Sequence, residues 1–340
     1  MRVVITGYNT CCLNHTGGVQ VRIKKIYQLL SRRDDVDIEY FRPMETNFDK
    51  VDVLHLFKLE PEYFNLVMKA KSEGIKIVLS SVVPISDAKK LMLYRVINRL
   101  PVLTIYKMQQ MILNVVDKVI AETYQEAEYI KKYYSINGDK IVVIPNGIDY
   151  QPYKGDEIYS TMGKKKDYIL QVGLVHENKN QLNVIRALKG TGIDLVIIGG
   201  DNNGDMRYIN LCKKEAEGDE HIHFLGWVDN DSRLLKSAYS NAKVLAFPSF
   251  YETFGLVALE GAAAGCNIAI SKTLPILDFN IFDGCWLLDP HDVNDIKKKL
   301  LSAFEAPLTE KLKDRVIEFF SWDRIIDAHV QVYNEIYQHK

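Results

Sequence analysis

PSFYETFGLVALE, residues 248–260, is the stretch that decides the fold. It follows a short apolar strand and a Pro-Ser turn, and it carries two acids eight positions apart, Glu252 and Glu260. An Ala-rich segment then predicts a helix over residues 255–264. Because unpaired N–H groups and the positive end of the helix dipole lie at a helix start, this order predicts an anion site at the carboxyl edge of a strand.

Around this stretch, strands and helices alternate along the chain in the pattern of parallel sheets built from βαβ units. The pattern occurs twice. In the first half, strands are expected at residues 2–6, 37–41, 51–57, 76–80, 118–121 and 141–144. In the second half they are expected at residues 168–172, 194–198, 221–224, 243–247 and 267–270. The clearest helical stretches are residues 19–31, 181–188, 206–216, 232–239 and 255–264.

The length predicts two domains, because 340 residues exceed the size at which one hydrophobic core usually keeps growing. Residues 150–166 are polar and rich in lysine, which is typical of an interdomain linker. We therefore place a first α/β domain at residues 1–155 and a second at residues 156–322, each Rossmann-like. Ligands of such sheets bind at the carboxyl ends of the strands.

The stretch at 248–260 resembles the E-x7-E signature of family 4 of the retaining glycosyltransferases, whose GT-B fold has two Rossmann-like domains facing across a cleft. The resemblance is strongest over residues 168–288 and weakest over residues 81–114. It implies that the first domain takes the acceptor and the second binds a nucleotide-sugar donor. It also implies that a last helix, at about residues 323–340, packs back on the first domain.

The resemblance assigns a role to each residue of the stretch. A residue that matches Glu252 contacts the hydroxyls of the donor sugar, and one that matches Glu260 holds the ribose diol. Backbone N–H groups around the helix start meet sugar and phosphate oxygens. The donor-binding residues implied there are Thr253, Phe254, Gly255 and Leu256.

A second motif starts at Gly173 and resembles the G-R-L-x3-K-G segment of the family, in which Arg and Lys together bind the diphosphate. Lys179 matches the lysine, and its charge can stabilise the phosphate charge that grows as the sugar leaves. Leu174 stands in place of the arginine. Either another basic group such as Arg22 substitutes for it, or the donor phosphates are held more loosely.

Two further segments match the family. Gly17 and Gly18 precede a helix, and the family's glycine loop faces the donor diphosphate. This loop lacks the G-x-G-x-x-G spacing, which argues against a dinucleotide site. Gly226, Trp227 and Val228 match the segment that runs beside the nucleobase.

No catalytic base is evident from the sequence. Many relatives carry a histidine after a central strand of the first domain, but residues 80–84 read SSVVP. His15, in the glycine loop, is a candidate catalytic residue, and His176 lies in the phosphate loop. His55 is expected to be a core histidine because it lies inside an apolar strand. In this family the departing phosphate oxygen is thought to take the proton of the acceptor.

Charge and composition argue against several classes of function. The formal net charge is −1, so no basic footprint predicts nucleic-acid binding. The Asp-x-Asp pairs at residues 35–37 and 229–231 do not suggest a metal site, and we expect no metal and no cofactor besides the nucleotide-sugar co-substrate. Five cysteines without a disulfide or zinc pattern indicate reduced thiols and a cytoplasmic protein.

Residues 88–117 mix lysine and arginine with large apolar residues. This segment could lie on an anionic membrane surface, which would make the protein peripheral on the inner face of the membrane. It could equally form two helices that pack on the core with solvated basic faces. The sequence leaves both interpretations open.

The sequence therefore predicts a metal-independent, retaining glycosyltransferase. It would move a hexose-type sugar from a nucleotide-diphosphate sugar to a glycan or lipid-linked acceptor in cell-surface polysaccharide synthesis. A GT-B nucleotide-sugar epimerase or a sugar phosphorylase is an alternative. A non-catalytic nucleotide-sugar-binding subunit is another, because Leu174 replaces an arginine and the histidine after the central strand is missing.

Overall fold

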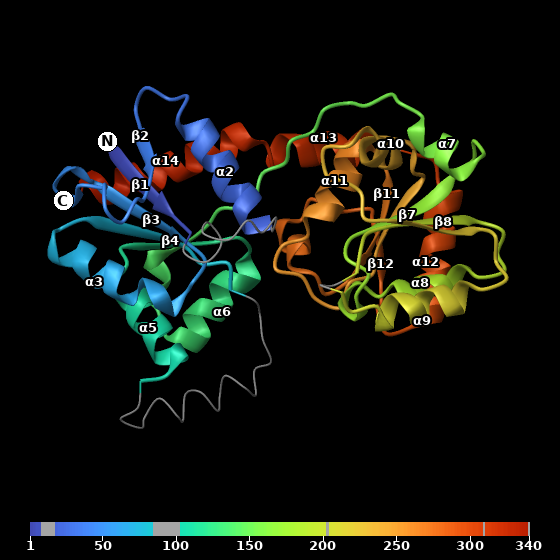
Figure 1. Ribbon diagram of the computed structural model, residues 1–340, viewed down its shortest axis with the longest axis horizontal. Coiled ribbons are helices and arrows are strands. Elements are labelled where there is room, and N and C mark those ends of the chain that lie inside the picture. The colour runs from blue at the N-terminus through green and yellow to red at the C-terminus, as the bar shows by residue number, and fades with distance from the viewer. Residues whose placement is uncertain (8–17, 84–102, 202–203, 309, 339–340) are drawn as a thin grey trace. The chain divides into compact units, whose positions relative to one another are not determined.

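The computed structural model describes residues 1–7, 18–83, 103–201, 204–308 and 310–338 (Figure 1). Their contacts divide the chain into two units, one made of Met1–Gly147 with Trp322–Lys340 and the other of Ile148–Ser321. Each unit contains a six-stranded parallel sheet with helices around it. The predicted α/β class with two Rossmann-like domains is confirmed.

The sheet of the first unit has the order β2-β1-β3-β4-β5-β6. Apart from the edge strand β2, its strands are mainly apolar, as expected where helices cover both faces of a parallel sheet. The chain passes from β1 to β2 on one side and builds the remaining strands on the other, so the strand order reverses between β1 and β3. The strands are β1 (Arg2–Thr6), β2 (Asp37–Tyr40), β3 (Val53–Phe57), β4 (Lys76–Ser80), β5 (Lys118–Ala121) and β6 (Ile141–Val143).

A helix from the end of the chain completes the first unit. Helix α14, red in Figure 1, packs against α2 and buries Tyr333 and Ile325 in the same cluster as Ile26 of α2. Gly147 fits against Trp322, since a Cβ there would lie 2.5 Å from the indole Cδ2. The helices of this unit are α2 (Gly18–Leu30), α3 (Phe64–Ser72), α5 (Ile105–Val115), α6 (Tyr124–Tyr134) and α14 (Trp322–Gln338).

The sheet of the second unit has the order β12-β11-β10-β7-β8-β9, so its strand order reverses between β7 and β10. The strands are β7 (Tyr168–Val172), β8 (Asp194–Ile198), β9 (Ile222–Gly226), β10 (Val244–Phe247), β11 (Asn267–Ser271) and β12 (Trp286–Leu288). The helices are α7 (Glu157–Met162), α8 (Gln181–Leu188), α9 (Arg207–Ala216), α10 (Arg233–Asn241), α11 (Leu256–Ala264), α12 (Val293–Glu305) and α13 (Glu310–Phe319). Short 3₁₀ turns occur at Phe48–Lys50, Pro61–Tyr63, Gly138–Lys140, Glu177–Lys179 and Pro275–Phe279.

The segment predicted to be a linker is partly a packed helix. Helix α7 lies within residues 150–166, and its Ile158 is fully buried, with its backbone N–H donated to Ser237 Oγ at 3.1 Å. The contacts assign the chain to the second unit from Ile148 onward. Polar composition was misleading here, because one buried isoleucine and a set of ion pairs are enough to attach the segment to the second sheet.

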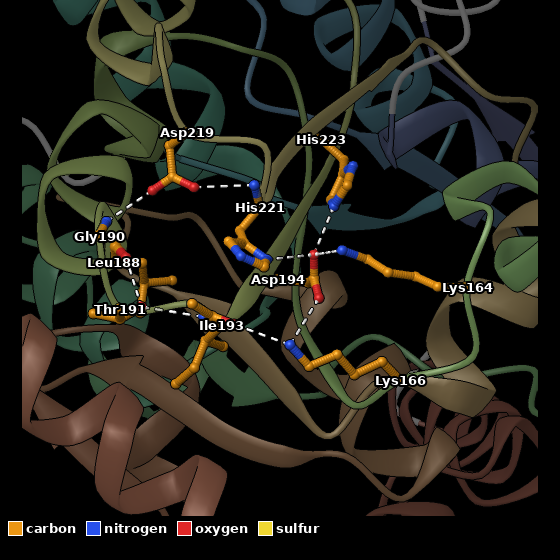
Figure 2. Close-up of polar contacts among 11 residues, drawn as sticks. Lys164, Lys166, Leu188, Gly190, Thr191, Ile193, Asp194, Asp219, His221 and His223 are labelled. Carbon is orange, nitrogen blue, oxygen red and sulfur yellow. Dashed lines mark hydrogen bonds and ion pairs between the residues drawn. The ribbon is translucent and has the colours of Figure 1, made fainter.

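Those ion pairs converge on a buried carboxylate at the start of β8, Asp194 (Figure 2). Its Oδ1 lies 2.7 Å from Lys164 Nζ, 3.2 Å from His221 Nδ1 and 2.8 Å from His223 Nε2, and its Oδ2 lies 3.5 Å from Lys166 Nζ. Burial raises the pKa of this carboxyl, but the hydrogen bonds from His223, Lys164 and His221 outweigh burial and lower the pKa to about 2. The cluster attaches the lysine run to the sheet.

We expect Asp194→Asn to destabilise the protein by about 2 kcal/mol at pH 7, because it removes a buried charge that has several partners. The pKa of Asp194 is lower in the folded chain than in the unfolded chain, so its contribution is present above about pH 4 and is lost as the pH falls toward 2. Urea unfolding at pH 7 and pH 3 measures both effects. A difference between wild type and variant that is as large at pH 3 as at pH 7 would contradict this assignment.

Candidate active site

The loops that follow β7 and β10 meet where the second sheet reverses its strand order, the position at which open α/β sheets bind ligands. Asn178 joins them. Its side-chain oxygen accepts the backbone N–H of Tyr251 at 3.1 Å, and its amide nitrogen donates to the Tyr251 carbonyl at 2.9 Å. The backbone N–H of Phe250 also donates to the Asn178 carbonyl at 2.9 Å. The two loops are therefore held in one fixed arrangement.

This arrangement brings Lys179 and Glu252 together. Lys179 Nζ lies 2.5 Å from Glu252 Oε1, and the two side chains are 22% and 14% exposed. The same ammonium group lies 5.5 Å from the ring centroid of Phe247, and a Cβ on Gly173 would approach the lysine side chain at 3.6 Å. A partly buried cation thus lies beside a partly buried carboxylate, a pair in which the lysine could contact an anionic group and the acid a hydroxyl.

The start of α11 lies on the same loop as Glu252. Gly255 precedes the helix at φ 121°, and no side chain caps the helix there. Phe254 is buried, packed edge-on against Phe279 and Phe320, while Thr253 is exposed and Leu256 is half-buried. Because the helix start has neither a capping side chain nor an acid in its first turn, its N–H groups suit an anionic oxygen.

Glu260 lies on α11, one turn beyond this start. Its Oε2 accepts a hydrogen bond from the Tyr239 hydroxyl at 2.5 Å. Desolvation raises the pKa of the Glu260 carboxyl, and the hydrogen bond from Tyr239 opposes that rise. The residue nevertheless keeps an exposed surface.

The remaining predicted residues of the second unit lie at the ends of other strands. Gly226 ends β9 at φ 73°, Trp227 is 70% exposed and Val228 is half-buried. Leu174 is 48% exposed. Arg22 was considered as a substitute for the missing arginine, and this hypothesis is wrong: its side chain is fully buried in the first unit and ion-paired with Glu122. A buried, paired guanidinium cannot reach a solvent-exposed phosphate.

The histidines differ in their surroundings. His176 Nδ1 accepts the backbone N–H of Asn178 at 3.1 Å. His55 is fully buried and bonded to Tyr333 and Ser80, as expected of a core histidine. His15 and Gly17 lie outside the described residues, and Gly18 is the first residue of α2.

Two other expectations concern residues that the structure describes only in part. Residues 88–102 of the basic, apolar segment lie outside the described ranges, whereas α5 buries Tyr106, Ile112 and Leu113 in the core. Within the described part of the chain, no helix is both long and apolar enough to span a bilayer. In the same residues, no three His, Cys, Asp or Glu side chains are grouped for a metal ion.

Sequence reasoning missed two residues of this site. Asn178 lies between Gly173 and Lys179, and a turn-forming residue between two motif positions was the available signal. Tyr239, the partner of Glu260, belongs to α10, and nothing in the sequence indicates that contact. Both act through contacts that are distant along the chain.

Comparisons with known proteins agree with this geometry. The model of "Glycosyl transferases group 1" matches residues 159–319, and that of "Glycosyltransferase Family 4" matches residues 21–151. An uncharacterized glycosyltransferase of Methanocaldococcus jannaschii, MJ1607, is 31% identical over 241 residues, which cover 64% of this chain and 59% of that protein. The D-inositol 3-phosphate glycosyltransferase of Mycolicibacterium smegmatis is 25% identical over 240 residues, 66% of this chain and 54% of that protein. The chain thus spans little more than half the length of these curated relatives.

Solved structures give the same fold over the whole chain. Anabaena HepE in complex with UDP has a TM-score of 0.77 at 12% identity, and the alignment covers 98% of this chain and 100% of that one. At this identity the similarity concerns the fold.

Proposed function

The chain belongs to the family 4 glycosyltransferases with the GT-B architecture, and from this premise we propose that it transfers a hexose-type sugar, with retention, from a nucleotide-diphosphate sugar to a glycan or lipid-linked acceptor. The observation that carries the proposal is the Lys179–Glu252 pair beside the uncapped start of α11, at the reversal point of the second sheet. A cation, a carboxylate and free helix N–H groups are the chemistry that a sugar diphosphate requires.

The proposed roles follow from this geometry. Glu252 accepts hydrogen bonds from the sugar hydroxyls and orients the ring, and Glu260 accepts hydrogen bonds from the ribose diol. As the bond between sugar and phosphate breaks, Lys179 and the amides at Gly255 and Leu256 stabilise the charge that develops on the leaving diphosphate. The departing phosphate oxygen takes the proton of the acceptor, and the reaction requires no metal and no further cofactor.

The nucleobase is proposed to be uracil, since the structural neighbour HepE was solved with UDP. The base would lie along Gly226, Trp227 and Val228, where the exposed indole offers a stacking surface. We further propose a role in cell-surface polysaccharide synthesis for a cytoplasmic protein that is peripheral on the inner face of the membrane. Residues 88–117 would supply that contact.

A second candidate is a non-catalytic subunit that binds a nucleotide sugar. The exposed Leu174 supports it, because this loop lacks the second cation of the family pattern and Arg22 does not replace it. An epimerase or phosphorylase of the same fold is a third candidate, and no described group specifically favours it. Release of UDP and of free sugar from UDP-sugars would separate an enzyme from a binding subunit.

The donor site is tested by thermal unfolding with UDP, GDP, ADP and CMP. We expect UDP to stabilise the wild type by about 2.7 kcal/mol at 100 times its Kd. Glu260→Ala should lose most of this stabilisation, because the ribose loses its acceptor. Glu305→Ala, which removes an exposed acid at the end of α12, is the matched control and should keep it. If no nucleotide stabilises the wild type, the assignment of the donor site is wrong.

A further inference from the structure

Two strained turns lie side by side in the first unit. Lys58 follows β3 at φ 69° and Val82 follows β4 at φ 43°. The other non-glycine residues with positive φ in the described ranges are Ser135, Asn180 and Asn280, and all three are caps of helices or 3₁₀ turns. A long side chain and a β-branched side chain at positive φ are unfavourable, and such strain concentrates at functional sites.

The two turns are bonded to each other. The backbone N–H of Lys58 donates to the Ser80 carbonyl at 2.7 Å, and that of Leu59 donates to the Ser81 carbonyl at 2.8 Å. Lys58 lies at the reversal point of the first sheet, between β1 and β3. Its side chain is 42% exposed and its Nζ lies 2.5 Å from Glu60 Oε1. Residues 81–83, which follow β4, are called the β4 turn below. A conformational change of this turn would therefore move Lys58, whose ammonium group lies at the carboxyl edge of the sheet, where ligands bind.

A buried carboxylate holds the β4 turn. Glu126 Oε1 accepts the Ser81 hydroxyl at 2.7 Å and the Val83 backbone N–H at 2.6 Å, so it bonds on both sides of Val82. Its Oε2 accepts the backbone N–H of Glu122 at 2.6 Å. Glu126 is 3% exposed, and burial together with the neighbouring Glu122 raises the pKa of its carboxyl.

A helix cap does not account for this residue. In a capping box the third helical residue reaches back to the N–H of the cap residue, which here is Thr123. The Glu126 carboxylate instead accepts the backbone N–H of Glu122, one residue before the cap, and the backbone N–H of Val83 in the turn after β4. A buried carboxylate beside a second one costs stability, so a cap alone would not explain its presence here.

We propose that Glu126 is a positioning residue for sugar transfer: through Ser81 and Val83 it keeps the strained β4 turn in place, and through that turn it fixes Lys58 where the acceptor meets the first unit. This proposal rests on the proposed function, and Lys58 would contact a negatively charged group of the acceptor. Glu126 itself touches no substrate. It acts through the hydrogen bonds between the two turns.

Hydrogen exchange at single amides tests the structural step without any ligand. In Glu126→Gln one of the two acceptor oxygens becomes an NH2 donor, so the side chain can no longer accept from both the Glu122 N–H and the β4 turn. The strain at Val82 is then no longer held by two acceptors, and the Val83 and Leu59 amides should exchange about tenfold faster, the factor for losing about one hydrogen bond. Val82→Gly in that background should restore slow exchange, because glycine adopts positive φ without strain. The proposal would be overturned if these amides exchanged at wild-type rates in Glu126→Gln. It would also be overturned if Val82→Gly did not restore slow exchange in that background.

The matched control is Asp117→Asn. Asp117 accepts the Ile77 backbone N–H at 2.9 Å and pairs with Lys71 at the opposite edge of the same sheet. This variant should speed exchange of the Ile77 amide and leave Val83 and Leu59 unchanged. Equal acceleration of all three amides in either variant would indicate general loosening of the sheet and would reject a specific role of Glu126.

The effect on sugar transfer is tested by measuring the rate of UDP release from UDP-glucose and, separately, the Kd of UDP. Glu126→Gln should lower kcat about tenfold and leave the Kd of UDP unchanged, with recovery in Glu126→Gln/Val82→Gly. An unchanged kcat would overturn the positioning role. If the wild type binds no nucleotide, the proposed function fails instead, and the exchange experiment still decides whether Glu126 holds the two turns.

Discussion

Lys179→Met should lower kcat/KM for sugar transfer by about 10²–10³-fold, the range found when one preorganised donor to a developing oxyanion is removed. The ammonium group lies against Glu252, next to the loop that opens α11, so it is placed to stabilise a leaving diphosphate. Leu174 and the buried Arg22 supply no substitute cation at this loop. Steady-state assays of UDP release and of sugar transfer measure the effect.

Methionine is chosen because it retains an apolar stem over the Phe247 ring and so limits the loss of packing. Lys243→Met is the matched control. Its side chain is 20% exposed, similar to the 22% of Lys179, but it precedes β10 at the opposite edge of the sheet and pairs with Asp167 at 3.7 Å. Activity of Lys179→Met that stays near the level of the control would contradict the role given to Lys179.

Gly199→Ala should cost about 3 kcal/mol of stability and abolish nucleotide binding, the largest stability effect we expect at this site. A Cβ at this position would lie 1.8 Å from the carbonyl oxygen of Gly173 and 2.7 Å from its carbonyl carbon. Both atoms belong to the backbone, so the methyl group must displace the loop between Gly173 and Lys179. Urea unfolding and the UDP-dependent thermal shift report the two losses.

Gly190→Ala separates this clash from the cost of the backbone conformation. Gly190 has φ 74° with nothing within 4 Å of an added Cβ, so alanine there should cost only about 1 kcal/mol and leave UDP binding intact. Equal losses in the two variants would show that close approach to Gly173 is not what requires a glycine at position 199.

Much of the fold could be predicted because the strands are apolar runs with clear ends. The expected strands at residues 2–6, 76–80, 118–121, 168–172 and 194–198 match the observed bounds. Strand β12 was not predicted, because three residues between two turns carry no periodicity. The helix α7 was missed since its buried face consists of a single isoleucine.

The candidate site was predictable only where a motif lies within one stretch of chain. The placement of Glu252, Gly255 and Glu260 around the start of α11 follows from the order of strand, turn and helix, whereas their roles at the donor rest on the family resemblance. The failure of Arg22 as a phosphate ligand has another cause, since its burial depends on Glu122, a hundred residues away along the chain. The hydrogen bonds that Glu126 accepts from Ser81 and Val83 have the same origin, because no local pattern encodes a contact between a helix start and the end of a strand about 45 residues earlier in the chain.

The return of α14 to the first unit has a consequence for biosynthesis. The second unit is one continuous segment, Ile148–Ser321, so the ribosome delivers all of it before α14 is made. One core cluster of the first unit stays incomplete until Trp322, Ile325 and Tyr333 emerge, because these residues complete the cluster around β1 and β3. During translation the second unit is therefore complete in sequence before the first, and a stalled or prematurely ended chain would present it attached to a first sheet that lacks the cover of α14 on one face.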